Sequence, residues 1–384
     1  MTKISKKGVL LEVKSGVQTS ILQFFQDAVE KKIFDAVMLP MKVPSGDSFA
    51  WIMIEDSKII KNAQPLAPIM PVNAAKALKR YTRKGKGKFK VAALLKPCEI
   101  RATIELTKLN QVNLDDVTLF SYDCVGALPM QDYIADPKEG DAKFEKLLTD
   151  KNWNSKYVKP VCKICDKFSL SASDLHFALN DQELLLFSNS ERGEKLITDL
   201  DLKVEINLKK WQTYIEEQKK IKLKNKEETY KIVKGMVEGF ENLTETFSNC
   251  IGCHNCSSSC PICYCRQCYF DSSVAKPNSD VVMMRAEDRG AVSLPLDRIM
   301  FHTGRMAHMS LSCVSCGLCS DACPVNIPVA KIFSYVASQT QKTFEYSAGA
   351  SAGDALPMKE YRLDELGELG ELVKSAEAQE GGHE

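Results

Sequence analysis

The 384-residue sequence lacks the features of several common protein classes. It contains no run of 18 apolar residues, so we expect no membrane span. Its first residues carry charge but no sustained apolar segment or small-residue cleavage site, so we expect no signal peptide. With 51 basic and 50 acidic side chains, the balanced charge gives no indication of nucleic-acid binding or a polybasic membrane patch. Neither G-x-G-x-x-G nor a P-loop occurs, which leaves a Rossmann dinucleotide site and nucleotide hydrolysis without support.

Cysteine, by contrast, is abundant, with 15 residues. In a chain without an export signal, so many thiols indicate a reducing cytoplasm, where cysteines are kept for metals rather than for disulfides. We therefore expect a cytoplasmic protein. The odd total also argues against a complete set of internal disulfide bridges.

Eight of these cysteines fall into two runs with identical spacing, each followed by proline. The runs are Cys250-x2-Cys253-x2-Cys256-x3-Cys260-Pro261 and Cys313-x2-Cys316-x2-Cys319-x3-Cys323-Pro324. A cubane iron–sulfur cluster needs four converging thiolates, of which three can come from one tight loop and the fourth from the start of a following helix. A zinc site would favour two separated C-x2-C pairs, so zinc and a disulfide knot are weaker interpretations. The runs predict two [4Fe–4S] clusters.

In two-cluster ferredoxins the fourth cysteine of each run ligates the other cluster. That fold, rather than the spacing, predicts crossed ligand sets: Cys250, Cys253, Cys256 and Cys323 for one cluster, and Cys313, Cys316, Cys319 and Cys260 for the other. An amphipathic helix is expected just before the second run. Its charged side chains can tune the cluster potentials by placing charge or hydrogen bonds near the sulfides: Arg298, His302, Arg305 and His308.

The N-terminal half alternates helical and strand patterns. A helix is predicted over residues 17–33, and Asn73 caps a second helix. Buried strands are predicted at 36–43, 49–55, 89–95 and 117–123. Strand–helix–strand alternation indicates an α/β domain with a mixed or mostly parallel sheet.

Two cysteines follow neighbouring strands of this predicted sheet. Cys98 and Cys124 lie just past the carboxyl ends of strands, where open α/β sheets bind ligands. Cys162-x2-Cys165 supplies two further thiols. The four thiols are one candidate for a third cluster. The alternative, two core cysteines and a small zinc or redox C-x2-C motif, is equally compatible with the spacing.

Three segments carry a resemblance to a known family: KPCEIRATIEL, YDCVGALP and CKICDKFSLSASDL. They resemble the beta subunits of coenzyme-F420-reducing hydrogenases and formate dehydrogenases, matching at Pro97-Cys98, Cys124-x-Gly126 and Cys162-x2-Cys165. The resemblance covers roughly residues 50–190 and the cysteine runs. It implies a flavin, usually FAD, beside an iron–sulfur cluster, and it favours the third cluster.

The chain departs from the family pattern after the C-x2-C motif. Lys167 separates Asp166 from Phe168, and His176-Phe-Ala-Leu replaces a glycine-rich continuation. His176 lies in an apolar strand pattern, so we expect a core side chain rather than a ligand. The residues that would contact the flavin are not predicted.

Three cysteines remain: Cys263, Cys265 and Cys268. A fourth cluster would need one more ligand, for which His254, Asp271 or a cysteine of the third site are candidates. The alternative is soft packing around the first two clusters.

The sequence predicts four units. These are an α/β flavin and iron–sulfur domain (1–205), a helical connector (206–248), a small ferredoxin-like two-cluster domain (249–340) and a flexible acidic tail (341–384). Our leading hypothesis is an electron-transfer oxidoreductase subunit that passes electrons between a flavin and several [4Fe–4S] clusters inside a larger complex. The alternative is a flavin-free, polyferredoxin-like relay. Either would serve a catalytic subunit of a formate dehydrogenase, hydrogenase or heterodisulfide-reductase-like complex, or exchange electrons with a ferredoxin.

Overall fold

The computed structural model describes residues 7–360, except 12, 14, 15, 151, 152, 171, 181, 182, 201–203, 206, 276, 277, 291–296 and 358. Its N-terminal region is built on an eight-stranded mixed sheet in the order β3-β2-β4-β5-β6-β7-β1-β8. The strands are β1 (Lys7–Leu11), β2 (Ala36–Lys42), β3 (Phe49–Ile54), β4 (Val91–Leu95), β5 (Val117–Tyr122), β6 (Leu175–Asn180), β7 (Glu183–Ser188) and β8 (Val204–Glu205). Strands β2, β4, β5 and β6 run parallel, and the remaining pairs are antiparallel. The predicted α/β class with a mixed sheet is confirmed.

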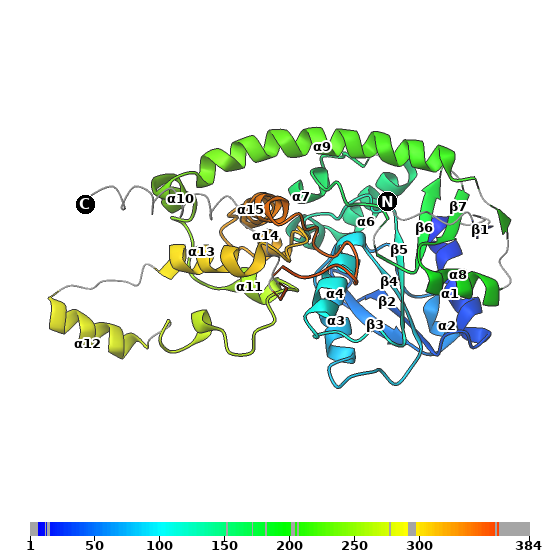
Figure 1. Ribbon diagram of the computed structural model, residues 1–384, viewed down its shortest axis with the longest axis horizontal. Coiled ribbons are helices and arrows are strands. Elements are labelled where there is room, and N and C mark those ends of the chain that lie inside the picture. The colour runs from blue at the N-terminus through cyan, green and yellow to red at the C-terminus, as the bar shows by residue number, and fades with distance from the viewer. Residues whose placement is uncertain are drawn as a thin grey trace, which may run out of the picture.

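Helices cover both faces of the sheet (Figure 1). The helices of the N-terminal region are α1 (Val17–Glu30), α2 (Ser57–Ile60), α3 (Ala74–Tyr81), α4 (Pro97–Lys108), α5 (Met130–Ala135), α6 (Pro137–Asp150), α7 (Pro160–Lys163) and α8 (Glu191–Asp199). Side chains alternate between faces along each strand, so Val37 and Leu39 of β2 pack with α1 while Met38 packs with α3 and α4. The predicted cap holds, since the Asn73 side chain accepts from Ala75 N.

The start of α4 is fixed by a buried carboxylate. Glu99 Oε2 accepts from Lys96 N at 3.0 Å, and Glu99 Oε1 accepts from Ala74 N at 2.9 Å. Pro97 occupies the first helical turn, where no backbone donor is needed. Glu99 therefore ties the starts of α3 and α4 together and fixes the position of Cys98 between them.

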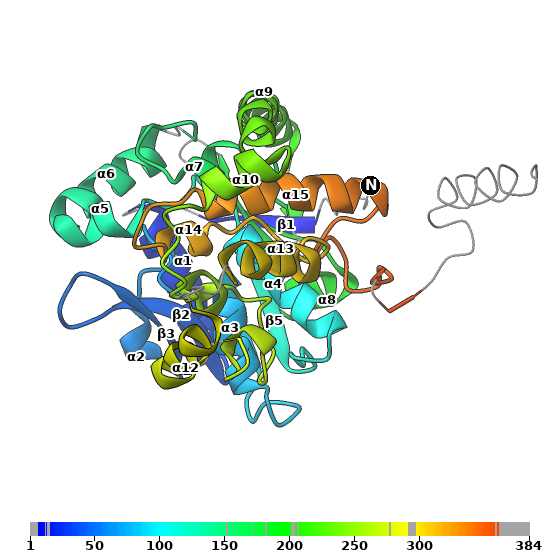
Figure 2. The same cartoon turned by 90° about the vertical axis from the view of Figure 1, so that its left-hand side faces the viewer.

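A 29-residue helix, α9 (Lys209–Val237), connects the sheet to the cysteine-rich region. Buried Trp211 packs against β6 and β7, and near the other end buried Val233 joins the core of the cysteine-rich region. Figure 2 shows α9 lying over α15 (Val329–Thr343), where Tyr230 Oη donates to Ser334 O at 3.0 Å. The connector thus packs on both regions.

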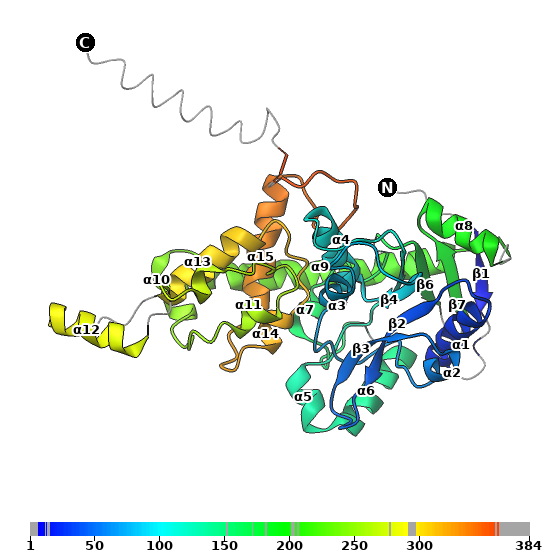
Figure 3. The same cartoon turned by 90° about the horizontal axis from the view of Figure 1, so that it is seen from below.

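The cysteine-rich region consists of short helices around the two cysteine runs. They are α10 (Phe240–Thr246), α11 (Asn255–Ser259), the 3-10 turn η1 (Tyr269–Asp271), α12 (Ser279–Arg289), α13 (Asp297–Met309), α14 (Leu318–Asp321) and α15. The amphipathic helix predicted before the second run is α13. None of the side chains of α12 is buried, and this helix projects away from the rest of the molecule (Figure 3).

The predicted flexible tail is wrong for its first part. After α15, residues 344–356 run back across α4, and Tyr346, Ala348 and Leu356 are buried. Composition could not reveal this packing, because it depends on partners that α4 presents from far away in the sequence. The prediction for 361–384 lies outside the described residues. No described helix is long and apolar enough to cross a membrane.

Candidate metal centres

The structure gathers twelve of the fifteen cysteines into three sets. Within each set, thiols lie within electrostatic reach of one another. The first set is Cys250, Cys253, Cys256 and Cys323. The second set is Cys260, Cys313, Cys316 and Cys319. The third set is Cys98, Cys124, Cys162 and Cys165.

The first and second sets exchange their fourth members between the two runs. Cys323, from the end of the second run, lies with the first run, and Cys260 lies with the second. The crossed arrangement arises because α11 packs against α14, so each run's last cysteine faces the other loop. All four thiols of the second set line one cavity, with Ile262 and Phe333 among the apolar residues of its wall.

The third set is assembled at the carboxyl edge of the parallel strands. Cys98 begins α4 just after β4, and Cys124 follows β5. Cys124 N donates to Phe168 O at 2.8 Å, which brings the segment after the C-x2-C motif against this edge. Gly126 has φ +111° and a Cβ there would lie 3.2 Å from Cys162 Cβ, so the tight turn after Cys124 lets Cys162 approach.

Burial makes free thiolates unfavourable in these sets. It raises the pKa of Cys98 well above its usual range, and with neighbouring Cys162 it raises the pKa of Cys124 to about 12. In the second set burial raises the pKa of Cys316 to about 12. Cys260 behaves differently from these three, because a hydrogen bond from Cys263 and the charge of Arg305 lower its pKa to about 6. Iron ions would supply the positive charge that buried thiolates need, so the donor sets fit cationic clusters.

Among the described residues, no three Cys, His, Asp or Glu side chains converge closely enough to hold a single metal ion. A cubane cluster spreads its four thiolates over four irons and needs no such convergence.

Buried cations stand between neighbouring sets. Arg305 Nη1 donates to Cys256 Sγ of the first set at 3.1 Å, and its charge also reaches Cys260 and Cys319 of the second. Lys159 occupies the corresponding place between Cys316 of the second set and Cys162 of the third. Cys98 of the third set also lies within electrostatic reach of Cys316. The three sets therefore lie in series, first to second to third.

No role of Lys159 was predicted from the sequence, and the structure places this residue in an ion pair. It forms a buried ion pair with Asp321 of α14. Although burial alone would lower it, the nearby Asp321 and Cys162 raise the pKa of Lys159. Lys159 immediately precedes Pro160 and the C-x2-C motif, but a lone lysine in a sequence gives no sign of burial.

Of the four residues predicted to tune the clusters, two reach cysteine sulfur. Besides Arg305, His302 Nε2 lies 3.4 Å from Cys250 Sγ, with its ring stacked on Phe247. Burial and the charge of Arg305 lower the pKa of His302 to about 3, so the ring is neutral. Arg298 instead donates to Ser248 O, and His308 is exposed.

The three remaining cysteines have different surroundings. Cys263 lies 3.4 Å from Met309 Sδ and donates toward Cys260, whereas Cys265 is exposed near Lys79. Two candidate partners for a fourth cluster, His254 and Asp271, pair with each other at 3.0 Å. The structure thus places Cys263 beside the second set, Cys265 on the surface, and Cys268 half-buried just before η1.

A cavity of about 240 Å³ opens beside the second and third sets. Cys165 and Cys313 both line it, with a cationic wall that includes Arg101, Lys167 and Lys226. Asp166 pairs with Lys226 at 2.9 Å, which leaves the wall with a positive balance. The charge suits an anionic ligand. The volume is below the roughly 300–1,000 Å³ of typical small-molecule pockets, so the cavity can receive only part of an FAD molecule.

Two curated relatives match most of the chain. The F420-dependent formate dehydrogenase subunit beta of Methanocaldococcus jannaschii is 26% identical over 91% of this chain and 96% of that protein. The F420-dependent formate dehydrogenase 1 subunit beta of Methanococcus maripaludis is 28% identical over 86% of this chain and 90% of that protein. The chain is similar to these beta subunits over most of its length. The resemblance predicted from the cysteine segments is confirmed.

A sequence family and one solved structure complete the comparison. The family described as a 4Fe-4S dicluster domain matches residues 246–327, which contain both cysteine runs in full, and this match supports an iron–sulfur function for the cysteine-rich region. One chain of the F420-reducing [NiFe] hydrogenase complex from Methanosarcina barkeri aligns with a TM-score of 0.45 and 14% identity, over 63% of this chain and 97% of that chain.

Proposed function

We propose that this chain is an electron-transfer subunit that carries three [4Fe–4S] clusters in series. The observation that supports it most is the grouping of twelve cysteines into three adjacent sets of four, with a buried cation at each junction. The third set would lie at the sheet edge and the first set at the other end of the series, where Cys253 is exposed. Electrons would enter or leave at those two ends.

The partner in this proposal is a catalytic subunit of a formate dehydrogenase or hydrogenase type of complex. The names of the relatives support it, since each is described as one subunit of an F420-dependent formate dehydrogenase. In this proposal the described residues around the three sets would hold the clusters, exclude water and fix the charge around them.

Iron and sulfide analysis of the anaerobically purified full chain tests the cluster count. We expect about 12 iron and about 12 sulfide per chain, because three cubanes carry four of each. Cys98→Ser should remove about four irons, whereas the matched variant Cys263→Ser should retain all of them. An iron-free, colourless protein that binds zinc would contradict the proposal.

A flavin is the second part of the proposal. The cationic cavity beside Cys165 and Cys313 supports it, because a phosphate or an anionic ring placed there would adjoin both sets. A bound flavin would supply exchange between two-electron and one-electron transfer. Flavin measured on the same samples should approach one per chain.

The flavin-free relay remains a second candidate, favoured by the cavity's small volume. Only trace flavin in a sample with full iron would select the relay and reject the flavin. The cluster count and the flavin content are thus decided independently.

A further inference from the structure

Arg101 is a buried cation whose charge is not matched by a carboxylate in its described contacts. It lies on α4, one turn after Cys98, and only 8% of it is exposed. Arg101 Nε donates to Ala348 O at 2.8 Å, and Nη1 donates to Val314 O at 3.3 Å. Both acceptors are backbone carbonyls. Arg101 thus forms no ion pair among its described contacts, unlike Lys159, which pairs with Asp321.

The position of Arg101 is shared between two cysteine sets. It lines the same cavity as Cys165 of the third set and Cys313 of the second. Val314, which accepts its hydrogen bond, directly follows Cys313. The guanidinium thus places a positive charge beside both sets.

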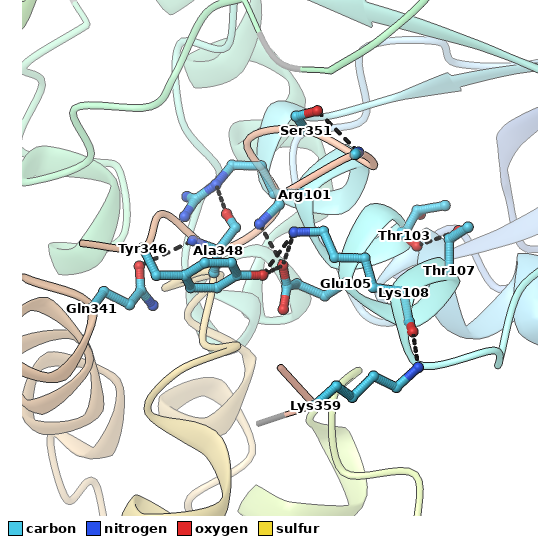
Figure 4. Close-up of polar contacts among 12 residues, drawn as sticks. Arg101, Thr103, Glu105, Thr107, Lys108, Gln341, Tyr346, Ala348, Ser351 and Lys359 are labelled. Carbon is cyan, nitrogen blue, oxygen red and sulfur yellow. Dashed lines mark hydrogen bonds and ion pairs between the residues drawn. The ribbon is translucent and has the colours of Figure 1, made fainter. Parts of the chain in front are cut away.

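Residues 344–356, here called the C-terminal strap, hold Arg101 in this place. Figure 4 shows the strap crossing α4, with Tyr346 and Ala348 meeting Arg101, Glu105 and Lys108. Buried Glu105 accepts from Tyr346 Oη at 2.5 Å and from Gly349 N at 2.7 Å. Because Glu105 has two donors from the strap, the carbonyl of Ala348 is fixed over Arg101.

Two further features fix the path of the strap. Gln341 Nε2 donates to Cys313 O at 3.0 Å, while Gln341 Oε1 accepts from Ala348 N at 3.2 Å. Gly349 has φ +68°, and a Cβ at this position would lie 2.3 Å from Arg101 O. Only glycine fits so close to the helix, so the strap's path depends on that residue.

We propose that Arg101, clamped by the C-terminal strap, is a shared positive charge that raises the reduction potentials of the clusters held by the second and third sets. The proposal rests on the clusters proposed above. Each added electron makes a thiolate-ligated cluster more negative, so a fixed cation nearby favours the reduced form. Burial limits solvent screening of this interaction.

A redox titration of the anaerobic full chain, followed by EPR, tests the proposal. The third cluster is identified by the signal lost in Cys98→Ser, and the first by the signal lost in Cys253→Ser. Arg101→Met should lower the potentials of the second and third clusters and leave that of the first unchanged. Arg192→Met is the matched control, because exposed Arg192 of α8 donates to Leu114 O and Asp115 O. The control should leave all potentials unchanged.

Two more variants separate charge from structure. Arg101→Lys keeps the positive charge and should keep both potentials close to wild type, whereas a fall as large as that of Arg101→Met would overturn the proposal. Gly349→Ala should displace the strap and lower the same two potentials by a smaller amount. If Arg101→Met loses iron, Gly349→Ala decides: lowered potentials support the proposal and unchanged ones overturn it.

The number of cluster signals in the wild-type protein tests the proposed function separately from the role of Arg101. Fewer than three cluster signals in wild type would reject the proposed function itself. Three signals in wild type, with unchanged potentials in a fully loaded Arg101→Met protein, would reject only the role of Arg101.

Discussion

The sheet region and the cysteine-rich region differ in what fills their centres. Under the sheet, fully buried Phe120 lies 5.0 Å from Phe25 and 6.0 Å from Phe177, measured between ring centroids, within one large aromatic and aliphatic core. In the cysteine-rich region the buried residues include Cys250, Cys256 and Cys323 themselves. The core of the sheet region is mainly apolar, whereas the core of the cysteine-rich region includes thiols that would be held by a metal under the proposed function.

Removal of iron should therefore have the largest effect, and this effect should differ most between the two regions. This prediction rests on the proposed clusters. Metal binding supplies on the order of 10 kcal/mol of folding free energy in small metal-bound domains. Anaerobic chelation of the full chain should open residues 250–323 and the Cys162-x2-Cys165 segment of the third set to limited proteolysis, while α1 and the strands of the sheet stay protected.

The same chelated sample provides the internal control, since its sheet region should keep its circular dichroism signal. Uniform protection after complete iron loss would show that the cysteine-rich region folds without metal. Uniform cleavage would show that the two regions are one cooperative unit.

A truncation in the sheet core should come next in size. Phe120→Ala should lower the free energy of unfolding of the sheet region by about 3–5 kcal/mol, because it removes a buried ring from the centre of the aromatic cluster. Urea denaturation followed by fluorescence measures the loss. Phe120→Leu should cost clearly less, and both variants should retain the iron of the first and second sets, which lie outside the sheet region. A loss of more than about four irons, those of the third set, would contradict the separation of the two regions.

The sheet region and the cysteine-rich region also differ in how much of each could be predicted from the sequence. The sheet, and the edge of it that carries Cys98 and Cys124, could be predicted from local patterns. Strands and helices alternate along the chain, and these two cysteines follow the ends of strands. The crossed exchange of Cys260 and Cys323 needed the analogy with two-cluster ferredoxins, because spacing alone does not say which loops face each other.

The contacts between the two regions could not be predicted from the sequence. Lys159 and Asp321 are 162 positions apart in the numbering, and nothing local marks either as a buried partner. The strap has the composition of a flexible segment, yet Tyr346 and Gly349 find their acceptor on Glu105. Such long-range pairs depend on the assembled fold, so local propensity cannot reveal them.

A third prediction concerns the buried hydrogen-bond network where α9 packs against the sheet. Buried Asp123 accepts from Ser169 Oγ, His176 Nε2, Leu179 N and Trp211 Nε1. Asp123→Asn keeps the shape but turns one acceptor oxygen into a donor, so we expect a loss of about 2–3 kcal/mol in the free energy of unfolding. The matched change Asp199→Asn, on exposed α8, should stay within about 0.5 kcal/mol of wild type. Equal effects at the two sites would show that the Asp123 network contributes no net stability.

The smallest effect is expected on α12, which contrasts most strongly with the sheet. Met283 is 55% exposed and Met284 is 59% exposed, and no side chain of this helix is buried. Because these side chains are already in water, Met283→Ala and Met284→Ala should each change the free energy of unfolding by less than about 0.5 kcal/mol. The same truncation at Met38, which is 3% exposed on β2, should cost about 2–5 kcal/mol. Urea denaturation of the three variants measures the difference, and a loss above about 1 kcal/mol at Met283 or Met284 would mean that α12 packs against the chain in solution.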